Sequence, residues 1–308
     1  MSRSSWPVSS RQLLSMAALS LGHHALFAQA ALNAIIPFTL KDNCLYVRCA
    51  VNATDSLTFL FDTGADGSVI NGASAVAKKL TRDGTSLNVG SNGRTTVDRS
   101  TGNTIAFGSL TKTNVAFTII PYETAAFDGV FGTDLMAGYV IEINYQQKQL
   151  RFYDAARQLD LSGYSRHKLR FINSYPAIRC AVTAQGKRYP GWFGLDTGAD
   201  NVLTVAAPFV RQHGLVARLP KIGSSVSQGS DGSSYENPLV LAAAIHIGQQ
   251  PFYRLPIELS QSTEGIDAAT DKAGYWGNNF LKRFDAVWDF PQRTLYLRPN
   301  SNLYTKFF

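Results

Sequence analysis

Residues 59–66 read Phe-Leu-Phe-Asp-Thr-Gly-Ala-Asp, and residues 193–200 repeat them almost unchanged as Phe-Gly-Leu-Asp-Thr-Gly-Ala-Asp. In each copy an apolar strand leads to a carboxylate on a tight turn. The threonine can hydrogen-bond a backbone, and the glycine lets another chain segment approach closely. A single Asp-Thr-Gly is usually a plain turn. The second copy, 134 residues further on, makes the pattern informative.

The similarity extends on both sides of this motif. Upstream, Val-Arg-Cys-Ala-Val at 47–51 matches Ile-Arg-Cys-Ala-Val at 178–182. Downstream, a glycine-bracketed apolar pair occurs in each half, and the segments that follow align at one offset of 145 residues: Gly129–Gly132 with Gly274–Gly277, and 135–154 with 280–299. A repeat of this length indicates gene duplication and two lobes rather than a solenoid of short units.

Each unit is rich in strand signals and poor in helix signals. Apolar and β-branched runs predict strands at 45–51 and 57–61 and a hairpin over 140–153, and the polar, glycine-punctuated stretch 85–108 resembles a long hairpin. Asn71 is expected to cap a short helix that runs to Leu80. The fold class is therefore all-β. A polar linker at about 155–170 separates an N-terminal lobe, 31–160, from a C-terminal lobe, 161–308.

Composition and missing motifs exclude several function classes. The 308 residues carry a net charge of +7 with no basic run, so we expect no nucleic-acid partner. Cys44, Cys49 and Cys180 allow at most one disulfide and fit best as small buried apolar residues. The sequence contains no CxxC, HExxH, GxSxG, GxGxxG or GxxxxGK. We therefore expect no metal and no cofactor.

The beginning of the chain has the pattern of an export signal. Arg3 and Arg11 precede the apolar run 13–21, and Ala-Gln-Ala at 28–30 is a small-x-small cleavage signature. The run is too short for the roughly 20 helical residues that span a bilayer, so no stable membrane insertion is expected. Residues 1–30 are read as a signal peptide, with an uncleaved amphipathic anchor as the alternative. An exported chain with three cysteines fits a bacterial periplasm, or secretion from a bacterium.

The duplicated carboxylates point to acid–base chemistry. Docking of two lobes about a pseudo-two-fold axis would place Asp62 and Asp196 face to face. Two carboxylates about 3 Å apart share one proton over a range of pH. Such a pair can deprotonate a water while its retained proton polarises a carbonyl oxygen, which is peptide hydrolysis without metal or covalent intermediate. The alternative is a duplicated strand and turn in which the aspartates have only a structural role and cap the backbone of the turn.

Together these motifs resemble the two-lobed, retroviral-like (retropepsin and pepsin-like) aspartic proteases of bacterial type, over about residues 40–300. The resemblance implies two β-barrel lobes with the active site in the cleft between them. It implies Asp62 and Asp196 as the catalytic dyad and a crossed threonine pair beneath them. The supporting residues that it assigns are Thr63, Gly64, Thr197 and Gly198. The segments 129–132 and 274–277 match the family's apolar-apolar-Gly element behind each catalytic loop.

Two departures set the chain apart from the pepsin-like branch of the family. Asp66 and Asp200 stand where pepsin-like enzymes usually have Ser or Thr, and no tyrosine occurs between Tyr46 and Tyr122 to serve as a flap tyrosine. Glycine-bearing loops at 90–93 and 229–232 are the flap candidates, with mobile surface hairpins as the alternative. The substrate-binding candidates in these loops are Gly90, Asn92, Gly93, Gly229 and Gly232.

The leading interpretation is an exported aspartic endopeptidase that binds extended polypeptide under its flaps. Because one chain holds both halves of the pair, we expect a monomer. A non-catalytic peptide-binding module of the cell envelope on the same fold is the alternative, although degenerate relatives are expected to lose one aspartate. An envelope structural protein is a third class, favoured only by the net charge and the export signal.

Overall fold

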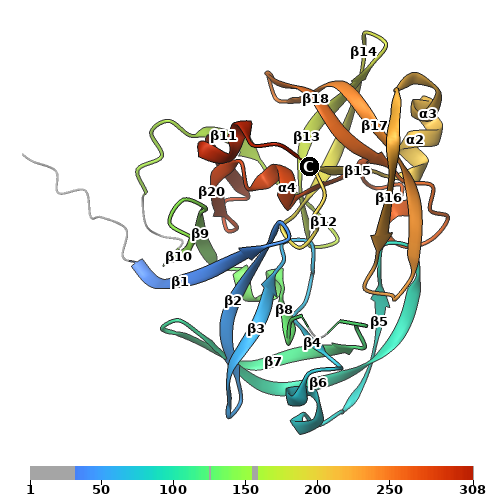
Figure 1. The fold of residues 1–308 in the computed structure, drawn as a ribbon. Coiled ribbons are helices and arrows are strands. Elements are labelled where there is room, and N and C mark those ends of the chain that lie inside the picture. Colours follow the sequence, from blue (N-terminus) through green and yellow to red (C-terminus); the bar gives the residue numbers. More distant parts are fainter. Residues whose placement is uncertain (1–31, 125, 155–158, 308) are drawn as a thin grey trace, which may run out of the picture.

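The computed structural model describes residues 32–124, 126–154 and 159–307. Nearly all of its regular structure is β-strand, arranged in two lobes that share one sheet (Figure 1). In Figure 1 the first lobe, blue to green, lies below, and the second, yellow to orange, lies above. The all-β, two-lobed architecture expected from the sequence is confirmed. The expected signal segment lies outside the described residues.

Six strands of the first lobe form a closed ring. In ring order they are β2 (Cys44–Val51), β3 (Thr54–Phe61), β8 (Gly129–Phe131), β4 (Val69–Asn71), β7 (Leu110–Ile120) and β6 (Arg94–Phe107). Pairing of β6 with β2 closes the ring, and the pairs β3–β8 and β4–β7 are parallel while the others are antiparallel. Because the ring is closed, each of these six strands is paired with a neighbour on both sides.

The second lobe repeats this ring strand for strand. Its members are β13 (Tyr175–Ala184), β14 (Lys187–Asp196), β19 (Gly274–Gly277), β15 (Leu203–Val205), β18 (Gln250–Leu259) and β17 (Ser234–Ile247). The β13–β17 pair closes this ring, and β14–β19 and β15–β18 are again the parallel pairs. Topology and strand direction therefore match in the two lobes.

A sheet built from both halves of the chain joins the rings, at the left of Figure 1. Its strands are β1 (Leu32–Lys41), β10 (Gln149–Asp154), β9 (Tyr139–Asn144), β20 (Phe284–Asp289), β21 (Thr294–Pro299) and β11 (Ser165–Lys168). At its centre Ile143 pairs with Ala286 and Ile141 with Trp288. Because these positions correspond at the offset of 145, a local two-fold axis passes between β9 and β20.

The alternation of apolar and polar side chains along each strand explains which face of the strand is buried in the core. In β2 the side chains of Leu45, Val47, Cys49 and Val51 point inward and are buried, while Arg48 points outward. Burial of such alternate residues from every strand produces one apolar cluster that runs through both lobes. Residues 165–168, expected within a linker, instead pair with β21, and the short strand β12 (Arg170–Ile172) pairs with β13.

Helices are few and short. They are η1 (Ala75–Lys79), α1 (Thr133–Met136), α2 (Ala207–His213), α3 (Leu215–Arg218), η2 (Ile266–Ala268), α4 (Asn278–Leu281) and η3 (Ser301–Tyr304). The expected helix from Asn71 to Leu80 is wrong in its start and type. Asn71 ends β4, and a 3₁₀ helix begins later, where the Ser74 hydroxyl accepts the Val76 N–H. Oδ1 of Asn71 accepts the Ala73 N–H (3.0 Å), but no helix starts there, and the side-chain amide donates to the carbonyls of Thr124 and Phe127.

Two long hairpins extend from the rings toward each other. Strand β5 (Gly84–Val89) pairs with β6 in the first lobe, and β16 (Lys221–Gln228) pairs with β17 in the second. Their turns contain residues 90–93 and 229–233. In Figure 1 the hairpins meet at the right, on the side away from the shared sheet. We call them the first and second hairpin.

Candidate active site

The two Asp-Thr-Gly motifs meet between the lobes. Asp62 follows the last residue of β3, and Asp196 is the last residue of β14. Each aspartate lies against the glycine of the opposite motif, since a Cβ atom at Gly64 would overlap the Asp196 carboxylate and one at Gly198 would overlap that of Asp62. Only glycine permits this approach. Both aspartates are half-buried.

Each carboxylate is oriented by its own turn. Oδ1 of Asp62 accepts the N–H groups of Gly64 (2.6 Å) and Ala65 (3.2 Å). Oδ1 of Asp196 accepts those of Gly198 and Ala199, both at 2.9 Å. With Oδ1 of each group held in this way, Oδ2 of Asp62 remains to face the partner carboxyl or a third molecule, and Oδ2 of Asp196 accepts a further donor from the second lobe.

A crossed pair of threonines locks the lobes together beneath the aspartates. The Thr63 hydroxyl donates to the Leu195 carbonyl (2.8 Å) and accepts the Thr197 N–H (3.1 Å). The Thr197 hydroxyl donates to the Phe61 carbonyl (2.8 Å) and accepts the Thr63 N–H (3.0 Å). Both threonines are buried, so each of these four bonds replaces one to water and fixes the relative position of the two motifs.

A short helix supports each aspartate-bearing turn from behind. The Thr133 N–H at the start of α1 donates to the Ala65 carbonyl (2.9 Å), and the Asn278 N–H at the start of α4 donates to the Ala199 carbonyl (2.7 Å). The expected apolar-apolar-Gly segments lead directly into these helices: the first spans β8 and the residue after it, Gly132, and the second is β19. The two supports are therefore equivalent.

The electrostatics favour one proton on the pair. Burial raises the pKa of Asp62 well above its ordinary value, and the charge of Asp196 with a hydrogen bond between the two carboxyl groups adds to the rise. The N–H groups of Gly64 and Ala65 act in the opposite direction by stabilising the carboxylate. Because ionising the second carboxyl costs more than ionising the first, the pair holds one proton over a range of pH.

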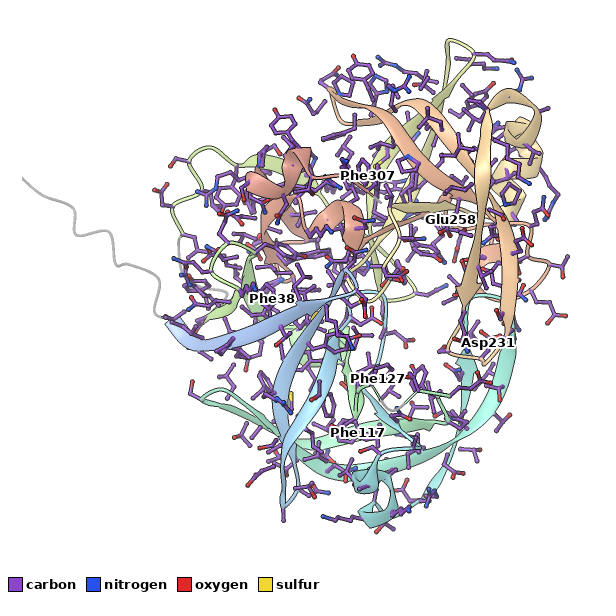
Figure 2. All side chains as sticks on the ribbon, in the orientation of Figure 1. Phe38, Phe117, Phe127, Asp231, Glu258 and Phe307 are labelled. Atoms are coloured by element: carbon purple, nitrogen blue, oxygen red, sulfur yellow. The ribbon has the colours of Figure 1, made fainter. Side chains whose placement is uncertain are left out.

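The two hairpins touch each other at their ends. The Asn88 side-chain amide donates to the Ser230 carbonyl (3.0 Å) across the gap. The first turn also docks on the second lobe, where the Ile266 and Asp267 N–H groups donate to the carbonyls of Gly90 (2.9 Å) and Ser91 (3.0 Å). Figure 2 labels Asp231 at this junction. The substrate-binding candidates among residues 90–93 and 229–232 thus come together, although 139 residues separate Gly90 from Gly229.

The lobes differ in the chemistry that flanks the carboxylates. In the first lobe an apolar cluster lies beside Asp62: Leu60, Ala65, Val69, Val97, Ile120, Tyr122, Phe127 and Val130. In the second lobe Thr204 occupies the place of Val69 in the β15–β18 ladder and donates to Glu258 (3.0 Å), which also accepts the Ser227 hydroxyl (3.2 Å). Phe127 and Glu258 are labelled in the two lobes in Figure 2. One wall is apolar and the other polar and acidic.

Sequence reasoning missed one residue in contact with the carboxylates. Tyr175, at the start of β13, donates its hydroxyl to Oδ2 of Asp196 at 2.7 Å. The only sequence signal is a break in the repeat, since Gly194 stands where the first copy has Leu60.

Other site types find no support in the described ranges 32–124, 126–154 and 159–307. Within them no group of three or more His, Cys, Asp or Glu side chains is arranged to hold a metal ion. All three cysteines are buried free thiols. Burial raises the pKa of Cys49 and Cys180 to about 12, which keeps both thiols protonated. None of the helices in these ranges has the length and apolar character needed to cross a bilayer.

Comparisons with known proteins agree with this geometry. Residues 47–135 match the family model described as aspartyl protease. The structure is similar to that of the aspartic proteinase from Irpex lacteus, with a TM-score of 0.57 and 13% sequence identity, over 88% of this chain and 98% of that one. At this identity the likeness shows the fold. None of the curated proteins matches the chain in sequence.

Proposed function

We propose that the chain is an active endopeptidase that hydrolyses peptide bonds with a water activated by Asp62 and Asp196. The match of residues 47–135 to the aspartyl protease model and the likeness of the fold support this proposal. The observation that carries this proposal is the mutual placement of the two carboxylates. Each has one oxygen fixed by the N–H groups of its turn, and each faces the other motif's glycine. Acid–base chemistry on a neutral substrate needs both a proton donor and a proton acceptor at one point.

The proposed reaction balances without a cofactor. The ionised carboxylate takes a proton from the water molecule while the water oxygen bonds to the carbonyl carbon of the peptide. At the same time the protonated carboxyl gives its proton to the carbonyl oxygen. In the resulting diol the first group passes its proton to the nitrogen as the C–N bond breaks. One diol hydroxyl returns a proton to the second group, and the pair regains its starting state.

The hairpins suit a substrate in extended conformation. Their turns meet between the two lobes, and β5 and β16 are edge strands that are unpaired on one side in the two sheets of the described chain. An extended peptide can add its backbone hydrogen bonds to such hairpins, while its side chains meet the apolar and polar walls in turn. The substrate class is therefore polypeptide. Digestion of a peptide library at several acidic and neutral pH values, with products identified by mass, tests the proposal.

The cleavage rate is expected to follow a bell-shaped pH profile. Activity falls at low pH because both carboxyls are protonated and no base remains, and it falls at high pH because both are ionised and no acid remains. Since the pKa of Asp62 is raised, the alkaline limb should lie above the value of about 4 that is usual for aspartate. Measurement of kcat/KM from pH 2 to 8 checks this, and a rate that rises steadily to pH 8 contradicts it.

The enzyme is expected to work as a monomer, because both aspartates and both hairpins come from one chain. Specific activity should stay constant on dilution through concentrations at which a weak dimer dissociates. Activity assays paired with mass photometry measure this. Loss of specific activity that follows dissociation would show that a second copy completes the site.

We further propose that the protein is exported after cleavage at the small-residue signature, so that the mature chain begins at Ala31. N-terminal sequencing of the protein recovered from a periplasmic or secreted fraction checks this expectation. An active exported form that still begins with the apolar run 13–21 would favour an uncleaved anchor.

A further inference from the structure

The two carboxylates sit in unequal surroundings despite the symmetry of the rings. Val47 pairs with Phe59 in the first lobe as Ile178 pairs with Phe193 in the second, which makes Cys44 the counterpart of Tyr175. By the same register Leu60 is the counterpart of Gly194. In the second lobe a tyrosine and a glycine thus stand where the first lobe has a cysteine and a leucine.

The two replacements fit each other. A Cβ atom at Gly194 would overlap the Tyr175 ring, so the ring occupies the space that a side chain at this position would fill. The Lys272 ammonium lies 5.3 Å from the centre of the same ring. The Tyr175 side chain is thereby fixed between β14 and the segment that precedes β19. It is 8% exposed, and its hydroxyl ends 2.7 Å from Oδ2 of Asp196.

Asp62 has no equivalent donor in the described part of the chain. Its hydrogen bonds there come from the N–H groups of Gly64 and Ala65 and from the shared contact with Asp196. At the counterpart position the Cys44 thiol donates to the Gly198 carbonyl rather than to a carboxylate. The first carboxylate therefore has two N–H donors, and the second has two N–H donors plus a phenol.

We propose that Tyr175 is a positioning residue that decides which carboxyl holds the shared proton, keeping Asp196 ionised as the base and Asp62 protonated as the acid. A hydroxyl that donates to a carboxylate stabilises its ionised form. Burial and the Asp196 charge raise the pKa of Tyr175 well above its ordinary value, so the phenol remains a donor throughout the working range. This inference rests on the proposed hydrolysis and assigns the roles of base and acid in it to the two carboxyl groups.

The test is the pH profile of Tyr175→Phe, which keeps the ring on Gly194 and removes only the hydroxyl. Without that donor Asp196 takes up a proton more readily, so the acid limb of kcat/KM should move upward by about one pH unit. The alkaline limb, which reports loss of the proton on Asp62, should stay within a few tenths of a unit. A rate that falls equally at every pH would show a purely structural role and overturn the proposal.

Tyr153→Phe is the matched control. Tyr153 is also 8% exposed and also donates to a carboxylate, that of Glu142 at 2.9 Å, but it lies in the shared sheet. Its profile should coincide with that of wild type. Site-specific 3-fluorotyrosine at position 175, a stronger donor with the ring and hydroxyl retained, should move the acid limb in the opposite direction and covers the case in which Tyr175→Phe does not fold.

A readout without turnover separates this inference from the proposed function. The carboxyl-carbon signals of ¹³C-labelled aspartate report the protonation of the pair directly. The first protonation of the pair below neutral pH should appear on Asp62 in wild type, and the second should occur at higher pH in Tyr175→Phe. If wild type cleaves no peptide but these shifts appear, only the proposed hydrolysis fails. If wild type cleaves and the titrations of both proteins coincide, the role of Tyr175 fails.

Discussion

Replacing either Asp62 or Asp196 by asparagine is expected to abolish peptide hydrolysis while the fold is retained. Asparagine is nearly isosteric with aspartic acid and can still accept the N–H bonds of each turn through its carbonyl oxygen. It can neither take a proton from water nor deliver one to the substrate. A positioned acid or base contributes roughly 10²–10⁴-fold, and because the pair acts as a unit, either loss should be near-total.

The stability of the Asp62→Asn variant tests the raised pKa of Asp62 without an activity assay. Burial and the neighbouring charge raise the pKa of Asp62 in the folded state, so the folded protein binds more protons than the unfolded chain above the ordinary aspartate pKa. Stability therefore falls as pH rises through that window. Asp62→Asn removes this loss, and its free energy of unfolding at pH 7 should equal or exceed that of wild type. Urea unfolding of both proteins at pH 4 and pH 7 measures the difference.

Asp55→Asn on the same strand is the control, because Asp55 is exposed and far from the turn. It should retain wild-type activity. A folded Asp62→Asn protein that cleaves peptides at near wild-type rate would refute the assignment. If wild type and both active-site variants bind peptides equally and cleave none, the chain is a binding module on a protease fold.

Arg283→Met is expected to destabilise the fold by about 3–5 kcal/mol, because it breaks a buried hydrogen-bond network. The Arg283 side chain is 1% exposed and follows α4, the helix that supports the Asp196 turn. Its guanidinium donates to the carbonyls of the C-terminal segment, including those of Asn302 (2.9 Å), Leu303 (3.1 Å) and Thr305 (2.7 Å). The Phe307 ring, labelled in Figure 2, lies 3.7 Å from it. Methionine fills the stem but leaves these acceptors unpaired, at about 1–3 kcal/mol for each one that stays buried.

Arg82→Met is the matched control for this prediction. The side chains of Arg82 and its partner Asp98 are 47% and 50% exposed, and the two charged groups lie 2.7 Å apart. Exposed ion pairs contribute at most about 1 kcal/mol, so the loss of stability should be small. Urea unfolding of both variants at pH 7 measures the difference. Equal losses would show that the C-terminal segment is not held by the buried arginine.

Local chemistry made part of this structure predictable. The Asp-Thr-Gly motif at 62–64 follows a strand and forms a tight turn, and the geometry of such a turn depends mainly on residues that are neighbours in sequence. Its repetition at 196–198 therefore predicted a second turn of the same kind. The alignment of 135–154 with 280–299 likewise predicted two hairpins, which became β9–β10 and β20–β21. The helix start expected at Asn71 is wrong because Asn71 pairs with Ile120 in β4 and its amide bonds the carbonyls of Thr124 and Phe127, about 50 residues away.

The sequence by itself thus determined the class of fold, the two lobes and the residues that form each turn, since strand periodicity and turn chemistry act over a few residues. Only the tertiary structure decided how those turns meet. The contact of Asn88 with Ser230, the bond from Tyr175 to Asp196 and the clamp of Arg283 on the C-terminal carbonyls all join polar atoms across loops or between lobes. Such bonds depend on distance and angle in three dimensions, and no periodic pattern along the chain encodes them.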